Sequence, residues 1–172
     1  MMNEKCFYFV EGECEAQLIH ALKLSPARLI SGRVKVYNTI QELIPKSVLL
    51  TIQTGTTIAL AFDTDKPDTT ILRKNIELIK RYCKRIKIVY LPQVLDFEDE
   101  MVRCTDVGSA IDLTHSRGLS NFKTDFCRLK ASDCRLLLER HHFNADLLWS
   151  KTPPVDYEFV SLNSDWVKTK QA

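Results

Sequence analysis

The segment TIALAFDTD, at positions 57–65, carries the clearest structural signal in this chain. Its first six residues are almost all apolar and show no polar alternation, which is typical of a central strand covered on both faces. Asp63 and Asp65 follow directly. A helix-like pattern begins at Thr69, and the apolar run at 85–91 predicts another strand. The segment is therefore expected to open a strand-helix-strand unit.

The residues before this segment repeat the same order of elements. CFYFV at 6–10 predicts a buried strand that ends at Glu11-Gly12, and the apolar spacing at 13–24 predicts an amphipathic helix. A weaker strand is expected at 29–37 and a short helix-like segment at 40–50. This order implies right-handed βαβ crossovers. The predicted fold class is α/β, with a Rossmann-like, mainly parallel sheet.

Chain length and a change of pattern suggest how the chain is divided. Its 172 residues suit one compact domain, alone or with a small appendage. The strand at 85–91 is expected to end at Pro92, after which helical patches replace strands. The expected division is an α/β domain over residues 1–95 and a mostly helical extension with a polar tail over 96–172. The tail is expected either to pack as a last extended segment or to dock on a partner.

Composition excludes several classes of protein. With 45% hydrophobic and 27% charged residues, the chain is neither disordered nor of low complexity. A formal charge of +2 neither demands nor forbids a nucleic-acid partner. The six cysteines form no CxxC pair, so reduced thiols and a cytoplasmic location are expected. No apolar run approaches the roughly 18 residues of a membrane span, so no membrane partner is expected.

Acidic residues follow two of the predicted strands. Glu11 comes directly after the first strand, and Asp63 and Asp65 come after the central one. The carboxyl ends of parallel strands open into one crevice, where such folds bind ligands. Converging carboxylates repel one another unless a cation neutralises them, and oxygen ligands favour Mg²⁺ or Mn²⁺. Glu15, one helical turn after Glu11, is a further candidate ligand; the alternative for each acid is a helix cap or a turn.

These motifs resemble those of the Toprim domain, which topoisomerases, bacterial primases, ribosomal-RNA maturases and OLD-family nucleases share. The resemblance rests on FVEG at 9–12 and ALAFDTD at 59–65, and it covers roughly residues 5–92. The form EGECE at 11–15 looks most like the OLD-family and small stand-alone Toprim nucleases, several of which serve in phage defence. Two departures are the sparse glycine near the second strand, where Gly32 stands alone, and Pro67 after the aspartates.

The resemblance implies a metal-dependent nuclease acting on DNA or RNA, with one or two Mg²⁺ or Mn²⁺ ions. Asp63 and Asp65 would hold the cation, Glu11 would be a ligand or a general acid/base, and Glu15 would hold a second metal. Such ions activate water and stabilise charge on a phosphate. A two-metal site needs further carboxylates, and Glu98 is the preferred candidate in the acidic run at 96–100. The alternative for that run is solvated charge at a helix start.

Basic residues near these acids are candidates for nucleic-acid binding. Lys66 follows the aspartates, Arg73 and Lys74 lie in the strongest basic patch, and Arg117 and Lys123 lie in the helical half. Their functional interpretation is contact with the phosphate backbone. The alternative is a solvated helix face.

A second function class stays open. The chain has no phosphate-binding loop of the type GxxxxGK[ST], so any ATP would be used by another chain. The alternative to a nuclease is a non-catalytic Toprim-like scaffold that docks on a larger partner such as an ATPase. The expected partners are therefore a nucleic acid and, in addition, a partner protein or a second copy of this chain.

Overall fold

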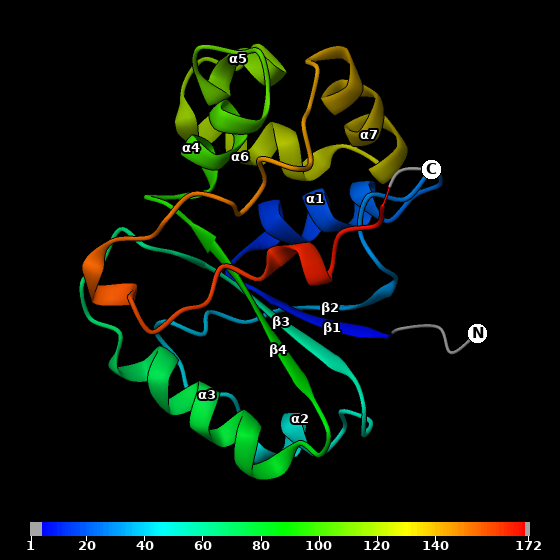
Figure 1. Ribbon diagram of the computed structural model, residues 1–172. Coiled ribbons are helices and arrows are strands. Elements are labelled where there is room, and N and C mark those ends of the chain that lie inside the picture. The colour runs from blue at the N-terminus through cyan, green and yellow to red at the C-terminus, as the bar shows by residue number, and fades with distance from the viewer. Residues whose placement is uncertain (1–4, 171–172) are drawn as a thin grey trace.

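The computed structural model describes residues 5–170 and has an α/β architecture with one parallel sheet (Figure 1). The strand order is β2-β1-β3-β4, and every pair of neighbours is parallel. The strands are β1 (Cys6–Val10), β2 (Gly32–Val36), β3 (Thr57–Asp63) and β4 (Lys87–Gln93). The prediction of an α/β fold with a mainly parallel sheet is confirmed.

The two central strands are apolar apart from the terminal residues Thr57 and Asp63 of β3, because both faces of the sheet are covered. In β3, Ala59 and Ala61 belong to the apolar cluster on one face, whereas Ile58, Leu60 and Phe62 belong to the cluster on the other. Alternate residues of a strand point to opposite faces, so a run without polar alternation is what a doubly covered strand requires.

Helices form a layer on each face of the sheet (Figure 1). On one face lie α1 (Glu13–Leu22), α4 (Phe97–Cys104), α5 (Ala110–Thr114), α6 (Leu119–Arg128) and α7 (Ala131–Arg140). On the other lie α2 (Lys46–Leu49) and α3 (Thr70–Tyr82). Helix α1 contacts both α6 and α7, so the helices after residue 96 share one apolar cluster with β1 and α1. No helix within residues 5–170 is long and apolar enough to cross a bilayer.

The C-terminal segment returns to the sheet and covers the outer edge of β4. It contains two short 3₁₀ turns, η1 (Val155–Tyr157) and η2 (Ser164–Trp166). The Asn163 side chain accepts a hydrogen bond from the Tyr90 backbone N–H at 2.9 Å and donates one to the Ile88 carbonyl at 3.0 Å. These bonds satisfy backbone groups that an edge strand would otherwise leave open. The tail thus packs against its own sheet.

Two predicted boundaries were wrong for local reasons. The segment at 40–50 forms only the single turn α2, because the buried Asn75 side chain holds residues 39–44 in an irregular conformation through three hydrogen bonds to their backbone. Strand β4 runs through Pro92 to Gln93 instead of ending before the proline. An edge strand tolerates proline because one side of its backbone needs no sheet partner.

Candidate functional site

The site lies at the edge of the sheet where the strand order reverses. In the order β2-β1-β3-β4, the chain adds strands on opposite sides of β1, so the crevice beyond the carboxyl ends of β1 and β3 is the topological switch point. Glu11 follows β1 and Asp63 ends β3. A pocket of about 330 Å³ opens there, and its lining residues are Glu11, Gly12, Glu13, Cys14, Glu15, Asp63, Phe97, Glu98, Lys123 and Cys127.

Glu11 is held in place by hydrogen bonds to both of its carboxylate oxygens. Its Oε2 accepts from the Asp63 backbone N–H at 2.8 Å, and its Oε1 accepts from the Asn38 side chain at 2.9 Å. These bonds join the ends of β1 and β3 to the residues just after β2. Glu11 is therefore a fixed acceptor at the base of the pocket.

Glu15, which is buried, and Asp63, which is partly buried, form a pair of acids beside Glu11. Burial raises the pKa of Asp63 to about 9, and the charges of Glu11 and Glu15 add to this rise. Burial also raises the pKa of Glu15 to about 7, with a further contribution from Glu11 and Glu98. Burial disfavours a charged carboxylate, and so does each neighbouring negative charge. The cluster is short of positive charge.

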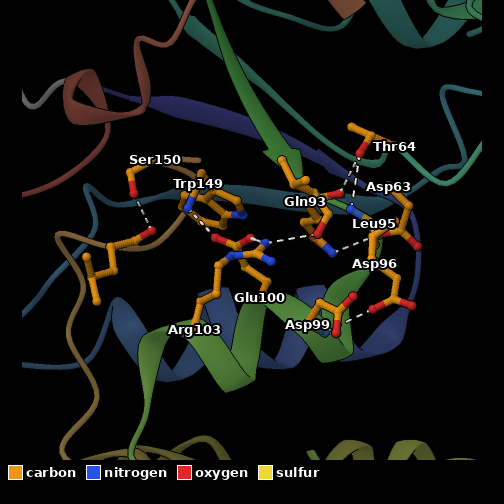
Figure 2. Close-up of polar contacts among 12 residues, drawn as sticks. Asp63, Thr64, Gln93, Leu95, Asp96, Asp99, Glu100, Arg103, Trp149 and Ser150 are labelled. Carbon is orange, nitrogen blue, oxygen red and sulfur yellow. Dashed lines mark hydrogen bonds and ion pairs between the residues drawn. The ribbon is translucent and has the colours of Figure 1, made fainter. Parts of the chain in front are cut away.

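Gln93 bridges Glu15 and Asp63, and no motif in the sequence points to it. Its Nε2 donates to Asp63 Oδ1 at 3.0 Å, as Figure 2 shows, and to Glu15 Oε1 at 3.3 Å. The side chain is buried at the carboxyl end of β4, directly beside Asp63 in the strand register. An edge strand can continue through a proline. Extending the predicted strand past Pro92 would have placed Gln93 at the same edge of the sheet as Asp63.

Glu98 and Lys123 meet across the same pocket. The Lys123 Nζ lies 2.9 Å from Glu98 Oε1, and the lysine side chain is 58% exposed whereas that of Glu98 is 11% exposed. The pairing depends on contacts between the aromatic rings of Phe97, Phe122 and Phe126, which hold α4 against α6. A cation at the mouth of an acidic pocket is suited to contact a phosphate.

Asp65 does not line the pocket. The buried Thr64 donates its backbone N–H to the carbonyls of Gln93 and Leu95 (3.1 Å each), and the extended strand ends at Asp63. Asp65 is exposed in the loop that follows, where its charge still contributes to the raised pKa of Asp63. The structure therefore brings Glu11, Glu15, Asp63 and Glu98 together and places Asp65 outside this group.

The remaining basic candidates lie away from the pocket lining. Lys66 is exposed in the loop after β3, and Arg117 is exposed in the loop before α6. Arg73 and Lys74 lie on α3, on the opposite face of the sheet from α1. The Arg73 guanidinium lies over the Phe159 ring, 3.8 Å from its centroid, and so anchors the C-terminal segment. Lys123 is the predicted cation that the structure places in the pocket.

Two other acids of the run at 96–100, Asp96 and Glu100, have structural roles. Asp96 caps α4 by accepting the Asp99 backbone N–H at 2.9 Å. Glu100 is buried on the side of α4 away from the pocket, where it accepts from the Trp149 backbone and from the Arg103 guanidinium (Figure 2). Of the acids in this run, Glu98 alone lines the pocket.

The chemistry of the donors fits a hard divalent cation, although the side chains are paired with other groups. Every candidate ligand is a carboxylate, and nearby acids contribute to the raised pKa of Asp63. Within residues 5–170, no three His, Cys, Asp or Glu side chains are already grouped so that they could hold a metal ion. Binding of a metal ion therefore requires Glu15 and Asp63 to break their hydrogen bonds to Gln93, and Glu98 to break its ion pair with Lys123.

Comparisons with known proteins add nothing to this picture, because no protein-family model, no curated protein and no solved structure matches the chain.

The acidic pair predicts a pH dependence of stability without metal. The unfolded chain releases these protons near pH 4, whereas folded Glu15 and Asp63 hold them to about pH 7 and 9. The stability conferred is present below pH 4 and is lost as pH rises through the folded pKa values. Each acid contributes about 1.4 kcal/mol per pH unit between its unfolded and folded pKa, so we expect the free energy of unfolding to fall by roughly 6 kcal/mol between pH 5 and 8.

Thermal unfolding in EDTA at several pH values measures this slope. The Glu15→Gln variant should lose the Glu15 share of the slope, roughly half of it between pH 5 and 7, because Asp63 still contributes the rest. Glu13→Gln, which changes an exposed neighbour, should keep the full slope. A wild-type melting temperature that is constant or rises over this range contradicts the prediction.

Proposed function

We propose that this protein is a divalent-metal-dependent phosphodiester hydrolase of Toprim type, a nuclease acting on DNA or RNA. The observation that carries the proposal is the convergence of four carboxylates, Glu11, Glu15, Asp63 and Glu98, on one pocket at the topological switch point of the sheet. The raised pKa of Asp63 supports it, because a cation would offset the repulsion that causes part of the rise.

The residues of the pocket have distinct expected roles. Asp63 and Glu11 would hold one Mg²⁺ or Mn²⁺ ion, and Glu15 and Glu98 would hold a second. A bound ion supplies an activated water and stabilises negative charge on the phosphate. Because both oxygens of Glu11 accept hydrogen bonds, this residue is oriented as a ligand rather than as a proton donor. Asp65, exposed beside the pocket, would contribute from outside when substrate is bound.

Lys123 would bring the substrate to the pocket. Its exposed ammonium group pairs with Glu98. When a metal ion and a substrate phosphate arrive, this ion pair would break, Lys123 would contact the phosphate and Glu98 would bind the metal. Lys66 and Arg117 are the exposed residues that would extend this contact along the nucleic-acid backbone.

Gln93 offers a direct test of the metal site through binding alone. In the Gln93→Glu variant, a carboxylate replaces the amide that touches both Asp63 and Glu15. The added negative charge should raise affinity for Mg²⁺ or Mn²⁺ roughly tenfold at pH 8, equivalent to about 1.4 kcal/mol. Calorimetric titration of the metal-free protein measures the change.

The matched control is Gln53→Glu, which adds the same charge at an exposed position before the amino end of β3, at the far end of the strand. Its affinity should equal that of the wild type. Equal affinities in all three proteins would contradict the placement of the ion beside Gln93.

The nuclease proposal itself is tested by incubating the protein with plasmid, single-stranded DNA, transfer RNA and structured RNA. Each substrate is tested with Mg²⁺, with Mn²⁺ and with EDTA. We expect cleavage of at least one substrate, and loss of that cleavage in EDTA. A protein that binds neither ion by calorimetry and cleaves nothing in the panel refutes the proposal.

One observation favours the second candidate function, a non-catalytic Toprim-like scaffold that docks on a larger partner such as an ATPase. The carboxylates of the described residues 5–170 are not already grouped to hold an ion, and Gln93 and Lys123 satisfy three of them in its absence. The same calorimetric titration separates the two candidates, because the scaffold needs no metal.

A further inference from the structure

Two cysteines lie in contact at the wall of the carboxylate pocket. Cys14, in the first turn of α1, and Cys127, near the end of α6, have their Sγ atoms 3.0 Å apart, although 113 positions separate them in the chain. Both residues line the pocket. Cys14 is buried and its Sγ also lies 3.7 Å from the Lys123 carbonyl, whereas Cys127 is partly exposed.

The other cysteines are differently placed. Cys6, Cys83, Cys104 and Cys134 are all buried, and none is hydrogen-bonded to another sulfur in the described part of the chain. Packing alone explains them, because free cysteine behaves as a small apolar residue. A pair in which one thiol is partly exposed and the other is buried in contact with it is the arrangement that lets a first oxidation be resolved by a second thiol.

We propose that Cys14 and Cys127 form a reversible disulfide when the protein meets a hydroperoxide. The more exposed Cys127 reacts first: its sulfur takes one oxygen from hydrogen peroxide, giving a sulfenic acid and one water. The Cys14 thiol then attacks that sulfur, the S–S bond forms and the S–OH bond breaks, releasing a second water. Overall two thiols lose two electrons, and one peroxide is reduced to two waters.

The geometry requires little movement. The sulfurs are already 3.0 Å apart, and a disulfide needs them at about 2.0 Å. The new bond would tie α1, which carries Glu15, to α6, which carries Lys123. It would therefore fix two elements that form the pocket wall. This covalent step is independent of the proposed nuclease activity, since it uses only the two thiols and the peroxide.

The test treats the reduced full-length chain with a small excess of hydrogen peroxide, blocks the remaining thiols and maps the peptides by mass spectrometry. We expect a mass decrease of about 2 Da before the thiols are blocked, one cross-linked peptide pair containing Cys14 and Cys127, and full reversal by dithiothreitol. The oxidised protein should also melt roughly 5 to 10 °C higher than the reduced one, because the bond closes a long loop.

Variants separate this pair from other thiols. Cys127→Ser and Cys14→Ser should each abolish the linked peptide, whereas Cys134→Ser, which removes a buried thiol on α7, should leave it. Circular dichroism checks that each variant folds, and Cys127→Ala repeats the test at the partly exposed position. A linkage of Cys127 to Cys134, or peroxide treatment that yields no disulfide, overturns the proposal.

Discussion

Replacement of Asp63 by Asn should lower the rate of metal-dependent cleavage roughly 1,000-fold, which corresponds to about 4 kcal/mol of lost transition-state stabilisation. Asp63 ends the central strand, lies beside Glu11 and Glu15 and is the acid whose pKa is raised furthest among the pocket carboxylates, to about 9. Asparagine keeps the shape and can still accept the Gln93 hydrogen bond, but it removes the negative charge that a cation requires.

Stability should move in the opposite direction to activity in this variant. Because Asp63→Asn removes an acid that is costly to ionise in its buried position, the metal-free protein should unfold at a higher temperature near pH 8 than the wild type. Cleavage rate and melting temperature, measured on the same preparation, therefore separate loss of a ligand from loss of fold.

The matched control is Asp112→Asn, which changes an exposed acid on α5 outside the pocket lining. Its cleavage rate should stay within about twofold of the wild type, since surface changes of this kind are nearly neutral. Undiminished cleavage by Asp63→Asn would remove this residue from the active site.

The Glu100→Ala variant should lose about 3 to 4 kcal/mol of stability, a fall of roughly 10 °C in melting temperature. Glu100 is completely buried and accepts from the Trp149 backbone N–H and from the Arg103 guanidinium (Figure 2). Arg103 in turn donates to the Val94 carbonyl at 3.1 Å. Alanine would leave a buried N–H and a partly buried cation without their partner, which costs more than the pair contributes.

Thermal and urea denaturation of two further variants identify the cause of this loss of stability. Glu100→Gln keeps an acceptor for the Trp149 N–H but no charge for Arg103, so its loss should be smaller than that of alanine. Glu77→Ala changes an exposed acid on α3 and should stay within about 0.5 kcal/mol of the wild type. A Glu100→Ala protein as stable as the Glu77→Ala control would show that the buried Glu100–Arg103 pair, through its contact with Trp149, does not hold the C-terminal segment.

Local patterns were sufficient for the two central strands and for Glu11 and Asp63. Residues 6–10 and 58–62 are unbroken apolar runs, and such runs have few alternatives to a doubly covered strand. Parallel strands end at one edge of the sheet, so Glu11 and Asp63 could be placed together before any contact between them was known. Both positions follow because the carboxyl ends of the strands lie at one edge in every parallel sheet.

Contacts between distant segments decided the rest of the pocket, because no local periodicity records which helix packs against which. Lys123 reaches Glu98 only because aromatic rings hold α4 against α6, and Cys127 reaches Cys14 across 113 positions of sequence. Gln93 joins the acids because an edge strand can continue through a proline, and Asp65 is excluded because the backbone bonds of Thr64 end the strand one residue earlier. Side-chain packing and hydrogen bonding in the folded chain fix these positions, and neither is encoded in residue spacing.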